Sequence, residues 1–166
     1  DPAEFYNDPH ASAEVAAVRV AEGFSAVKFD PAGQYTVYDG RMPDLEAMAQ
    51  SVAFCREIRA AVGARADMLF GTHGQFTAAG ALRLARHLEP FDPLWFEEPC
   101  PPDMPEEMAK VAAGSSIPVA TGERLCSKFE FARVLDLGAA AILQPDLGRA
   151  GGILEGKKIA AMAETR

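Results

Sequence analysis

The sequence predicts an α/β fold, a partial (β/α)8 (TIM) barrel of about five parallel strands with helices outside them. Two observations support this prediction. Short apolar runs recur along the chain, at residues 25–29, 67–70, 94–96, 117–120 and 140–143, with helical segments between them. Each run ends in polar or charged residues, and the active sites of barrel enzymes lie at the carboxyl ends of their strands.

The length of the chain limits this barrel. A complete (β/α)8 barrel takes about 250 residues, and this sequence has 166. Five parallel strands cannot close into a barrel of this kind. Either the chain is part of a longer protein, or another copy completes the barrel.

The first third of the chain predicts a helix, a strand, a long loop and a second helix. Residues 11–22 have helical character, with Ser12 as a candidate N-cap and Val15 and Val18 on the apolar face. Residues 24–29 form the first predicted strand. The loop at residues 30–43 contains Tyr35 and Tyr38, which either line a pocket or pack on the rim of the barrel.

The rest of the chain continues the alternation. Asp44 is the expected cap of a helix that ends near residue 62, and a strand follows at residues 68–70. Thr77 is the expected cap of the next helix, which leads through two prolines to the strand at residues 94–96. The remaining predictions are helices at 106–113, 128–137 and 153–164, and strands at 117–120 and 142–143.

Composition excludes several classes of partner. The net charge is −8 and the sequence has no basic run, which argues against nucleic acid and anionic membrane as partners. The three cysteines, Cys55, Cys100 and Cys126, lack metal-ligand spacing, so we expect reduced thiols and a cytoplasmic location. The sequence has no apolar run of 18 residues.

Chemistry is concentrated at the predicted strand ends, which carry Lys28, Asp30, His73, Glu97, Glu98, Glu123, Arg124 and Asp146. Adjacent parallel strands lie about 5 Å apart, so Glu97 and Glu123 on successive strands can reach one cation. Oxygen ligands favour Mg²⁺ over Zn²⁺. Such an ion can stabilise an enediolate while a lysine or histidine moves protons. The alternative is a set of salt bridges on the rim, such as Glu97 with Lys28.

Five motifs occur in a characteristic order: AVKFD at 26–30, THG at 72–74, WFEEP at 95–99, TGER at 121–124, and ILQPDL at 142–147 followed by two glycines at 151–152. With these motifs the chain resembles the barrel domain of the enolase superfamily, in its mandelate racemase/muconate lactonizing enzyme group. The resemblance is closest to acid-sugar dehydratases of the galactonate dehydratase type. It covers nearly the whole chain from about residue 11.

The resemblance implies a role for each matching residue. Glu97 and Glu123 match Mg²⁺ ligands. His73 matches the general acid that protonates the departing hydroxyl, and Lys28 matches a basic residue near the substrate carboxylate. Asp146 matches the aspartate that orients a catalytic histidine on a later strand, outside this chain.

The sequence also departs from the family pattern. Gly71 stands where the family has its first metal-binding aspartate, and Asp30 is the nearest acidic candidate for a third ligand. Asp30 also stands where the racemases have a lysine base, which disfavours two-base racemization. Arg124 and Gln75 are further candidates for substrate contact.

We therefore expect a Mg²⁺-dependent acid-sugar dehydratase, with Mg²⁺ as cofactor, a small sugar acid as substrate and a homo-oligomeric state. Residues 1–166 are expected to form an incomplete C-terminal barrel domain, without the N-terminal capping domain and the last barrel strands. One alternative is a sugar-acid isomerase or cycloisomerase that uses the same enolate. The other is a half-barrel fragment without catalytic activity.

Overall fold

The computed structural model describes residues 7–30, 32 and 41–166. Five parallel strands form one sheet in chain order, at Ala26–Phe29 (β1), Asp67–Gly71 (β2), Trp95–Glu97 (β3), Val119–Thr121 (β4) and Ile142–Leu143 (β5). Helices alternate with them, at Pro9–Ala21 (α2), Leu45–Val62 (α3), Ala78–Leu88 (α4), Pro105–Gly114 (α5), Lys128–Asp136 (α6) and Ile153–Ala163 (α7). Short 3₁₀ helices follow α3 and α4, at Gly63–Arg65 and Glu89–Phe91.

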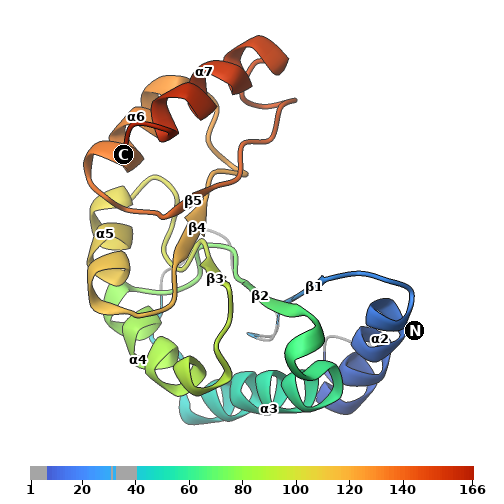
Figure 1. Ribbon diagram of the computed structural model, residues 1–166. Helices are drawn as coiled ribbons and strands as arrows, with labels where there is room; N and C mark the ends of the chain where they lie inside the picture. Colours follow the sequence, from blue (N-terminus) through green and yellow to red (C-terminus); the bar gives the residue numbers. More distant parts are fainter. Residues whose placement is uncertain (1–6, 31, 33–40) are drawn as a thin grey trace.

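The helices form an open arc outside the strands, from α2 at one end to α7 at the other (Figure 1). This arrangement confirms the predicted α/β class, with parallel strands inside and helices outside. Within the described residues, β1 and β5 are the two edges of the sheet.

Helix α2 differs from its prediction in its cap and in its buried face. The side chain of Asp8, and not Ser12, caps it by accepting hydrogen bonds from the backbone N–H groups of residues 10 and 11. Val15 and Val18 are exposed, and the buried residues are Ala13 and Ala16. The prediction was wrong because it took the larger side chains to mark the buried face, whereas small alanines lie there.

The other predicted caps are confirmed. Asp44 accepts a hydrogen bond from the N–H of Ala47 at the start of α3, and Thr77 accepts one from Gly80 in α4. Ser127 begins α6 with a reciprocal capping box to Glu130, which the sequence analysis did not identify.

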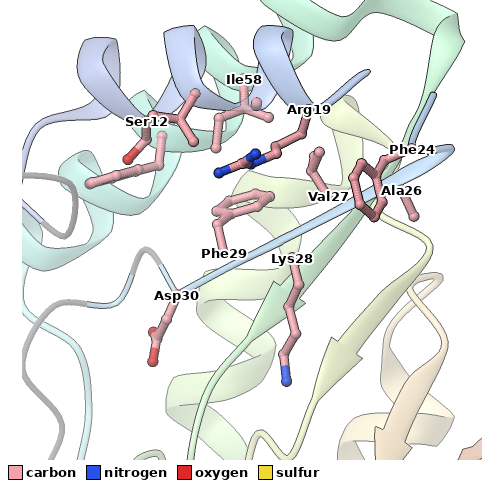
Figure 2. A pocket seen from close by; sticks show the side chains of 12 residues that line it. Ser12, Arg19, Phe24, Ala26, Val27, Lys28, Phe29, Asp30 and Ile58 are labelled. Atoms are coloured by element: carbon pink, nitrogen blue, oxygen red, sulfur yellow. The ribbon is translucent and has the colours of Figure 1, made fainter. Parts of the chain in front are cut away.

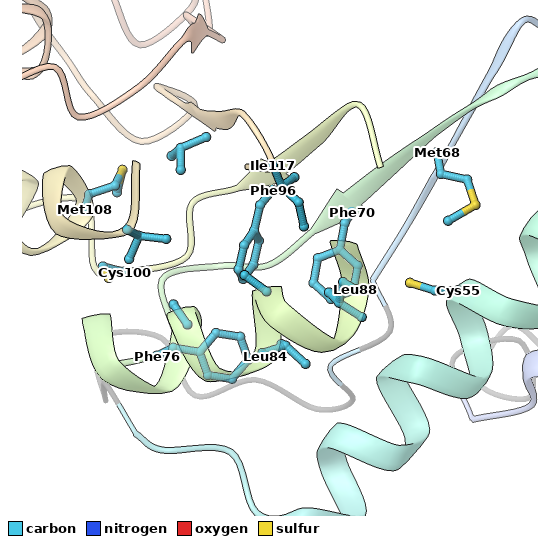
Figure 3. Packing of buried hydrophobic residues seen from close by; sticks show 14 of the residues in the cluster. Cys55, Met68, Phe70, Phe76, Leu84, Leu88, Phe96, Cys100, Met108 and Ile117 are labelled. Atoms are coloured by element: carbon cyan, nitrogen blue, oxygen red, sulfur yellow. The ribbon is translucent and has the colours of Figure 1, made fainter. Parts of the chain in front are cut away.

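Three aromatic rings form a column on the outer face of the sheet, between the strands and the helices. The strand register places Phe29 beside Phe70 and Phe70 beside Phe96. Their rings meet edge to face, with centroids 6.0 Å and 5.2 Å apart. Phe70 and Phe96 are fully buried beside Leu84 and Leu88 of α4 (Figure 3). Because side chains alternate along a strand, the residues next to this column face the inside of the sheet.

Three further predictions concern the loop tyrosines, the cysteines and membrane-spanning helices. Tyr35 and Tyr38 lie outside the described residues. All three cysteines are unpaired, as predicted; Cys55 and Cys100 are buried and Cys126 is exposed. In the described part of the chain, no helix combines the length and the apolar character that crossing a membrane requires.

Candidate active site

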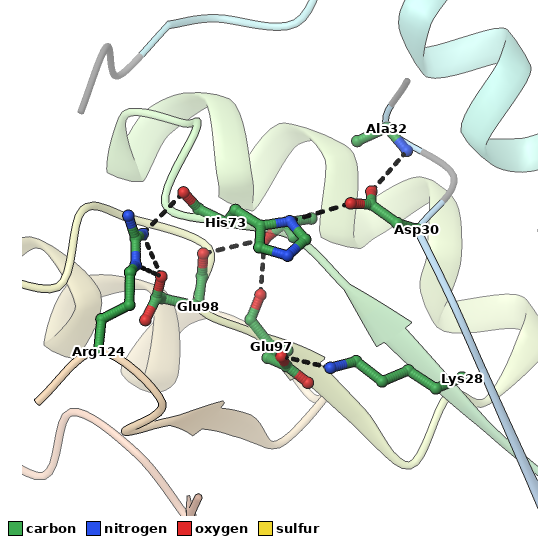
Figure 4. Close-up of polar contacts among 8 residues, drawn as sticks. Lys28, Asp30, Ala32, His73, Glu97, Glu98 and Arg124 are labelled. Carbon is green, nitrogen blue, oxygen red and sulfur yellow. Dashed lines mark hydrogen bonds and ion pairs between the residues drawn. The ribbon is translucent and has the colours of Figure 1, made fainter. Parts of the chain in front are cut away.

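The parallel register brings charged residues of β1 and β3 to the inner face of the sheet, on either side of Gly71 in β2. Lys28 pairs with Leu69, and Gly71 pairs with Glu97. Lys28, Gly71 and Glu97 therefore share the face opposite the aromatic column. Figure 4 shows the resulting cluster of polar side chains at the carboxyl ends of β1, β2 and β3.

Glu97 is the most deeply buried of the predicted metal ligands, with 1% of its surface exposed. The Lys28 ammonium lies 2.7 Å from its Oε1 atom, and the Gln144 side-chain amide donates to its Oε2 atom at 3.0 Å. Both carboxylate oxygens therefore have partners within the chain. These contacts compensate part of the desolvation cost of a buried charge, which is several kcal/mol for an unpaired ion.

His73 and Asp30 form a second pair at the same edge of the sheet. Nδ1 of His73 lies 3.0 Å from Oδ2 of Asp30, and the backbone N–H of Ala32 donates to the other Asp30 oxygen at 3.4 Å. Burial raises the pKa of Asp30 to about 6, although the His73 side chain acts in the opposite direction. The structure thus brings Asp30 to His73, where it orients the imidazole ring.

Glu98 and Arg124 form a third, more deeply buried pair. Nε of Arg124 donates to Oε1 of Glu98 at 2.6 Å, and its Nη2 atom contacts the same oxygen. Glu98 is fully buried, and this burial raises its pKa to about 7 against the opposing effect of Arg124. Arg124 also donates to the carbonyl of His73 at 2.7 Å, so it links β4 to the loop that carries His73.

The backbone around these pairs is strained and tightly held. Glu98 has a φ of 41°, in the left-handed region that costs a residue with a side chain about 1–2 kcal/mol. The Thr72 hydroxyl donates toward the carbonyl oxygens of Glu97 and Glu98, at 2.6 Å and 2.9 Å. The N–H of Gly74 donates to the carbonyl of Glu98 at 2.8 Å. Such strain persists where surrounding contacts hold it, and it occurs often at functional sites.

The other predicted site residues lie around these three pairs. Glu123 is half-buried, and its charge acts on Glu98 to raise the pKa of that carboxyl group further. Asp146 is exposed and accepts hydrogen bonds from the N–H groups of Gly148 and Arg149, at 2.7 Å and 3.2 Å. Gln75 is buried, with 4% of its surface exposed.

Sequence reasoning missed two residues of the site, Thr72 and Gln144. Thr72 fixes the backbone of both glutamates, and Gln144 holds one oxygen of Glu97. Both lie at strand ends within motifs, which is the signal that could have identified them. Neither side chain is ionisable, so neither stands out in the sequence as a candidate for acid–base or metal-binding chemistry.

The described donor set does not fit the three-carboxylate Mg²⁺ site that the resemblance implies. Glu97 already has a lysine ammonium and an amide as partners, and Gly71 offers no side chain. Within residues 7–30, 32 and 41–166, no three His, Cys, Asp or Glu side chains gather as a metal-binding group. Asp30, Glu97 and Glu123 are therefore not brought together in this structure.

A cavity of about 540 Å³ lies beside β1, between α2 and α3. Its lining includes Arg19, Phe24 and Phe29 (Figure 2). In this view the Lys28 side chain projects away from Phe29 and from the helices. Lys28 thus points toward the inner face of the sheet, where Glu97 lies.

A parallel sheet with helices outside it, and charged pairs gathered at the strand ends, is the layout of part of a (β/α)8 barrel domain. Comparison with known proteins then gives the family. Residues 10–166 match the family model described as enolase C-terminal domain-like, and the chain belongs to this family.

The chain is similar to several curated and solved proteins. It is 44% identical to D-galactonate dehydratase from Ralstonia nicotianae over 87% of the chain and 37% of that protein. It is 49% identical to D-galactonate dehydratase from Variovorax paradoxus over 71% of the chain and 31% of that protein. The crystal structure of a mandelate racemase/muconate lactonizing enzyme-like protein from Roseovarius sp. TM1035 matches with a TM-score of 0.95 and 62% identity, over 98% of this chain and 41% of that chain.

A second solved structure agrees. The mandelate racemase/muconate lactonizing enzyme from Jannaschia sp. CCS1 matches with a TM-score of 0.95 and 59% identity, over 99% of this chain and 42% of that chain. The described chain thus spans less than half the length of these relatives. These matches support the resemblance to enolase-superfamily proteins of the galactonate dehydratase type.

Proposed function

We propose that the full-length protein that carries this chain is an acid-sugar dehydratase, a lyase that removes water from a sugar carboxylate. The observation that carries this proposal is the Asp30–His73 pair, with 3.0 Å between Oδ2 and Nδ1, beside the Lys28–Glu97 pair. A histidine oriented by a carboxylate is suited to proton transfer. The D-galactonate dehydratases that this chain resembles support the same reaction class.

The proposed reaction proceeds through an enediolate. A base removes the proton on the carbon next to the substrate carboxylate, and the resemblance assigns this role to a histidine outside the chain, next to Asp146. The C–O bond to the neighbouring hydroxyl then breaks, and His73 donates the proton that makes water of the leaving group. The resulting enol rearranges to a 2-oxo-3-deoxy acid.

The described residues give His73 its orientation. When Nδ1 carries a proton it donates to Asp30, so Nε2 is the atom that transfers a proton to the leaving hydroxyl. The charge of His73 in turn lowers the pKa of Asp30, against the effect of burial. Lys28 has 47% of its side chain exposed, and in this proposal its ammonium binds the substrate carboxylate.

Magnesium enters this proposal only in part. The resemblance to the enolase superfamily implies Mg²⁺ on Glu97 and Glu123, where the ion would stabilise the enediolate electrostatically. Because the described donor set does not fit a three-carboxylate site, no reaction step is assigned to the ion. The substrate contacts of Arg124 and Gln75, and the homo-oligomeric state, also remain proposals.

The proposal is tested on the full-length protein with a panel of aldonic and aldaric acids. We expect one or more of them to be converted to a 2-oxo-3-deoxy acid. The His73→Asn variant should lower kcat by about 10²–10⁴-fold, the usual contribution of a general acid. The matched control is His87→Asn, on the exposed face of α4, which should leave kcat unchanged.

Other outcomes would support other functions. An isomeric product that forms without loss of water would support the isomerase alternative. Absence of turnover on the whole panel, or equal activity of wild type and His73→Asn, would contradict the dehydratase assignment.

A further inference from the structure

Lys28 and Glu97 form an asymmetric ion pair. Glu97 has 1% of its side chain exposed, whereas Lys28 has 47% exposed. The ammonium contacts Oε1 at 2.7 Å, and the Gln144 amide contacts Oε2 at 3.0 Å. The chain itself therefore provides the positive charge that this buried carboxylate requires.

The Lys28 side chain reaches Glu97 across β2, and Gly71 makes room for it. A Cβ placed at Gly71 would lie 3.3 Å from Cε of Lys28 and 3.2 Å from the carbonyl oxygen of Phe29. Both separations are tighter than ordinary van der Waals contact. An aspartate at this position would press against the lysine side chain and would compete with Glu97 for its ammonium. The observed position of the Lys28 side chain thus depends on the absence of a side chain at residue 71.

The charges point to the same conclusion. A divalent cation in a protein is usually held by several oxygen ligands, two or more of them carboxylates. A single ammonium neutralises one carboxylate and donates three hydrogen bonds in all. The contacts observed here join one buried glutamate, one lysine ammonium and one amide. They match neutralisation by an ammonium and not the binding of a divalent cation. The remaining N–H groups of a half-exposed ammonium can still bind an anionic ligand.

We propose that the Lys28 ammonium is the permanent counter-ion of Glu97 and takes the place of a divalent cation in this site. In this arrangement Lys28 binds the substrate carboxylate, and it stabilises the enediolate formed from it. This last part rests on the proposed function, whereas the counter-ion role does not.

Metal binding tests the proposal without any assay of turnover. Mn²⁺ is titrated into the full-length wild type, the Glu97→Gln variant and the Lys28→Met/Gly71→Asp variant, by calorimetry and by electron paramagnetic resonance. The double variant replaces the ammonium and supplies a second carboxylate. We expect it to bind Mn²⁺ at least about tenfold more tightly than wild type, a difference of about 1.4 kcal/mol. The control is Lys110→Met, an exposed lysine of α5 that pairs with Glu107.

A second measurement covers the case in which the double variant does not fold. The thermal midpoint of the wild type is measured in EDTA and in excess Mg²⁺, and we expect the two values to agree. Mn²⁺ binding to wild type that is lost in Glu97→Gln would overturn the proposal, because Glu97 would then be a metal ligand. A shift of the wild-type midpoint by Mg²⁺ that disappears in Glu97→Gln would overturn it as well.

The two proposals fail in different ways. Absence of sugar-acid turnover, together with weak Mn²⁺ binding by wild type, contradicts the dehydratase and leaves the counter-ion role of Lys28 supported. Turnover that EDTA abolishes, together with Mn²⁺ binding through Glu97, supports the dehydratase and overturns the role of Lys28.

Discussion

Arg124 is the residue whose loss should affect the buried charges most. Its side chain is 11% exposed, and its guanidinium contacts the fully buried Glu98. Replacing it in Arg124→Met leaves that carboxylate without a partner, which typically costs about 3–5 kcal/mol of unfolding free energy. Glu98 can escape part of this cost by protonation, so the loss should be larger at pH 8 than at pH 6. Urea unfolding at the two pH values measures it.

The control for this change is Arg19→Met, which removes an exposed ion pair with Glu22. Exposed pairs contribute about 0–1 kcal/mol, so this variant should unfold almost like wild type. The double variant Arg124→Met/Glu98→Gln should recover much of the lost stability at pH 8. Equal losses in the Arg19 and Arg124 variants would contradict the assigned importance of the buried pair.

The three thiols should differ strongly in reactivity. Burial raises the pKa values of Cys55 and Cys100 to about 12, and both side chains are inaccessible. Since the thiolate is the reactive form, iodoacetamide at pH 8 should modify Cys126 first. Mass spectrometry after short exposure measures the order of labelling. Labelling of Cys55 or Cys100 at the rate of Cys126, before unfolding in urea, would contradict the described packing.

At the scale of elements, the segment from β2 to α4 depends on Gly74. Its φ is 70°, and a Cβ there would lie 2.5 Å from Nη2 of Arg124 and 2.9 Å from the Cα of Pro101. The Gly74→Ala variant should lose about 1–3 kcal/mol, because it combines backbone strain with a displaced Arg124. The control is Gly138→Ala, which has a similar φ of 61° but open space around its Cβ. Both variants are measured by thermal unfolding. Because backbone strain is similar in the two, the additional loss in Gly74→Ala measures the steric clash.

Elements were predictable where a local signal determines them. Asp44 and Thr77 were identified as caps because each precedes a periodic apolar segment, and a cap requires only neighbouring residues. Helix α2 was predicted with the wrong cap and the wrong buried face. Close packing against neighbouring elements determines which face of α2 is buried. It buries Ala13 and Ala16 and leaves Val18 exposed. Such a choice depends on neighbouring elements that are distant in sequence.

The partial barrel and the strand ends that carry charge were predictable for a related reason. Parallel strands joined by helices place their carboxyl ends together, whatever the details of packing. The pairing of charges was not predictable from spacing alone. Lys28 was a candidate partner for Glu97, but the contact of Asp30 with His73 and that of Arg124 with Glu98 depend on register and side-chain direction.

At the scale of the whole molecule, two buried carboxyl groups should make stability decrease as the pH rises. Burial raises the pKa of Asp30 from 3.8 to about 6, and that of Glu98 from 4.5 to about 7. An acid with a raised pKa in the folded state contributes stability that is complete below its unfolded pKa. That contribution is lost as the pH approaches the folded value.

The unfolding free energy should therefore fall by on the order of 2 kcal/mol between pH 5.5 and 7.5. The net charge of −8 at pH 7 acts in the same direction, because repulsion among carboxylates grows as they ionise. Urea unfolding at several pH values measures this slope, and Glu98→Gln should flatten it because an amide does not titrate. A wild type that is more stable at pH 7.5 than at pH 5.5 would show that Arg124 and His73 outweigh burial. The two carboxyl groups would then be ionised in the folded protein well below neutral pH.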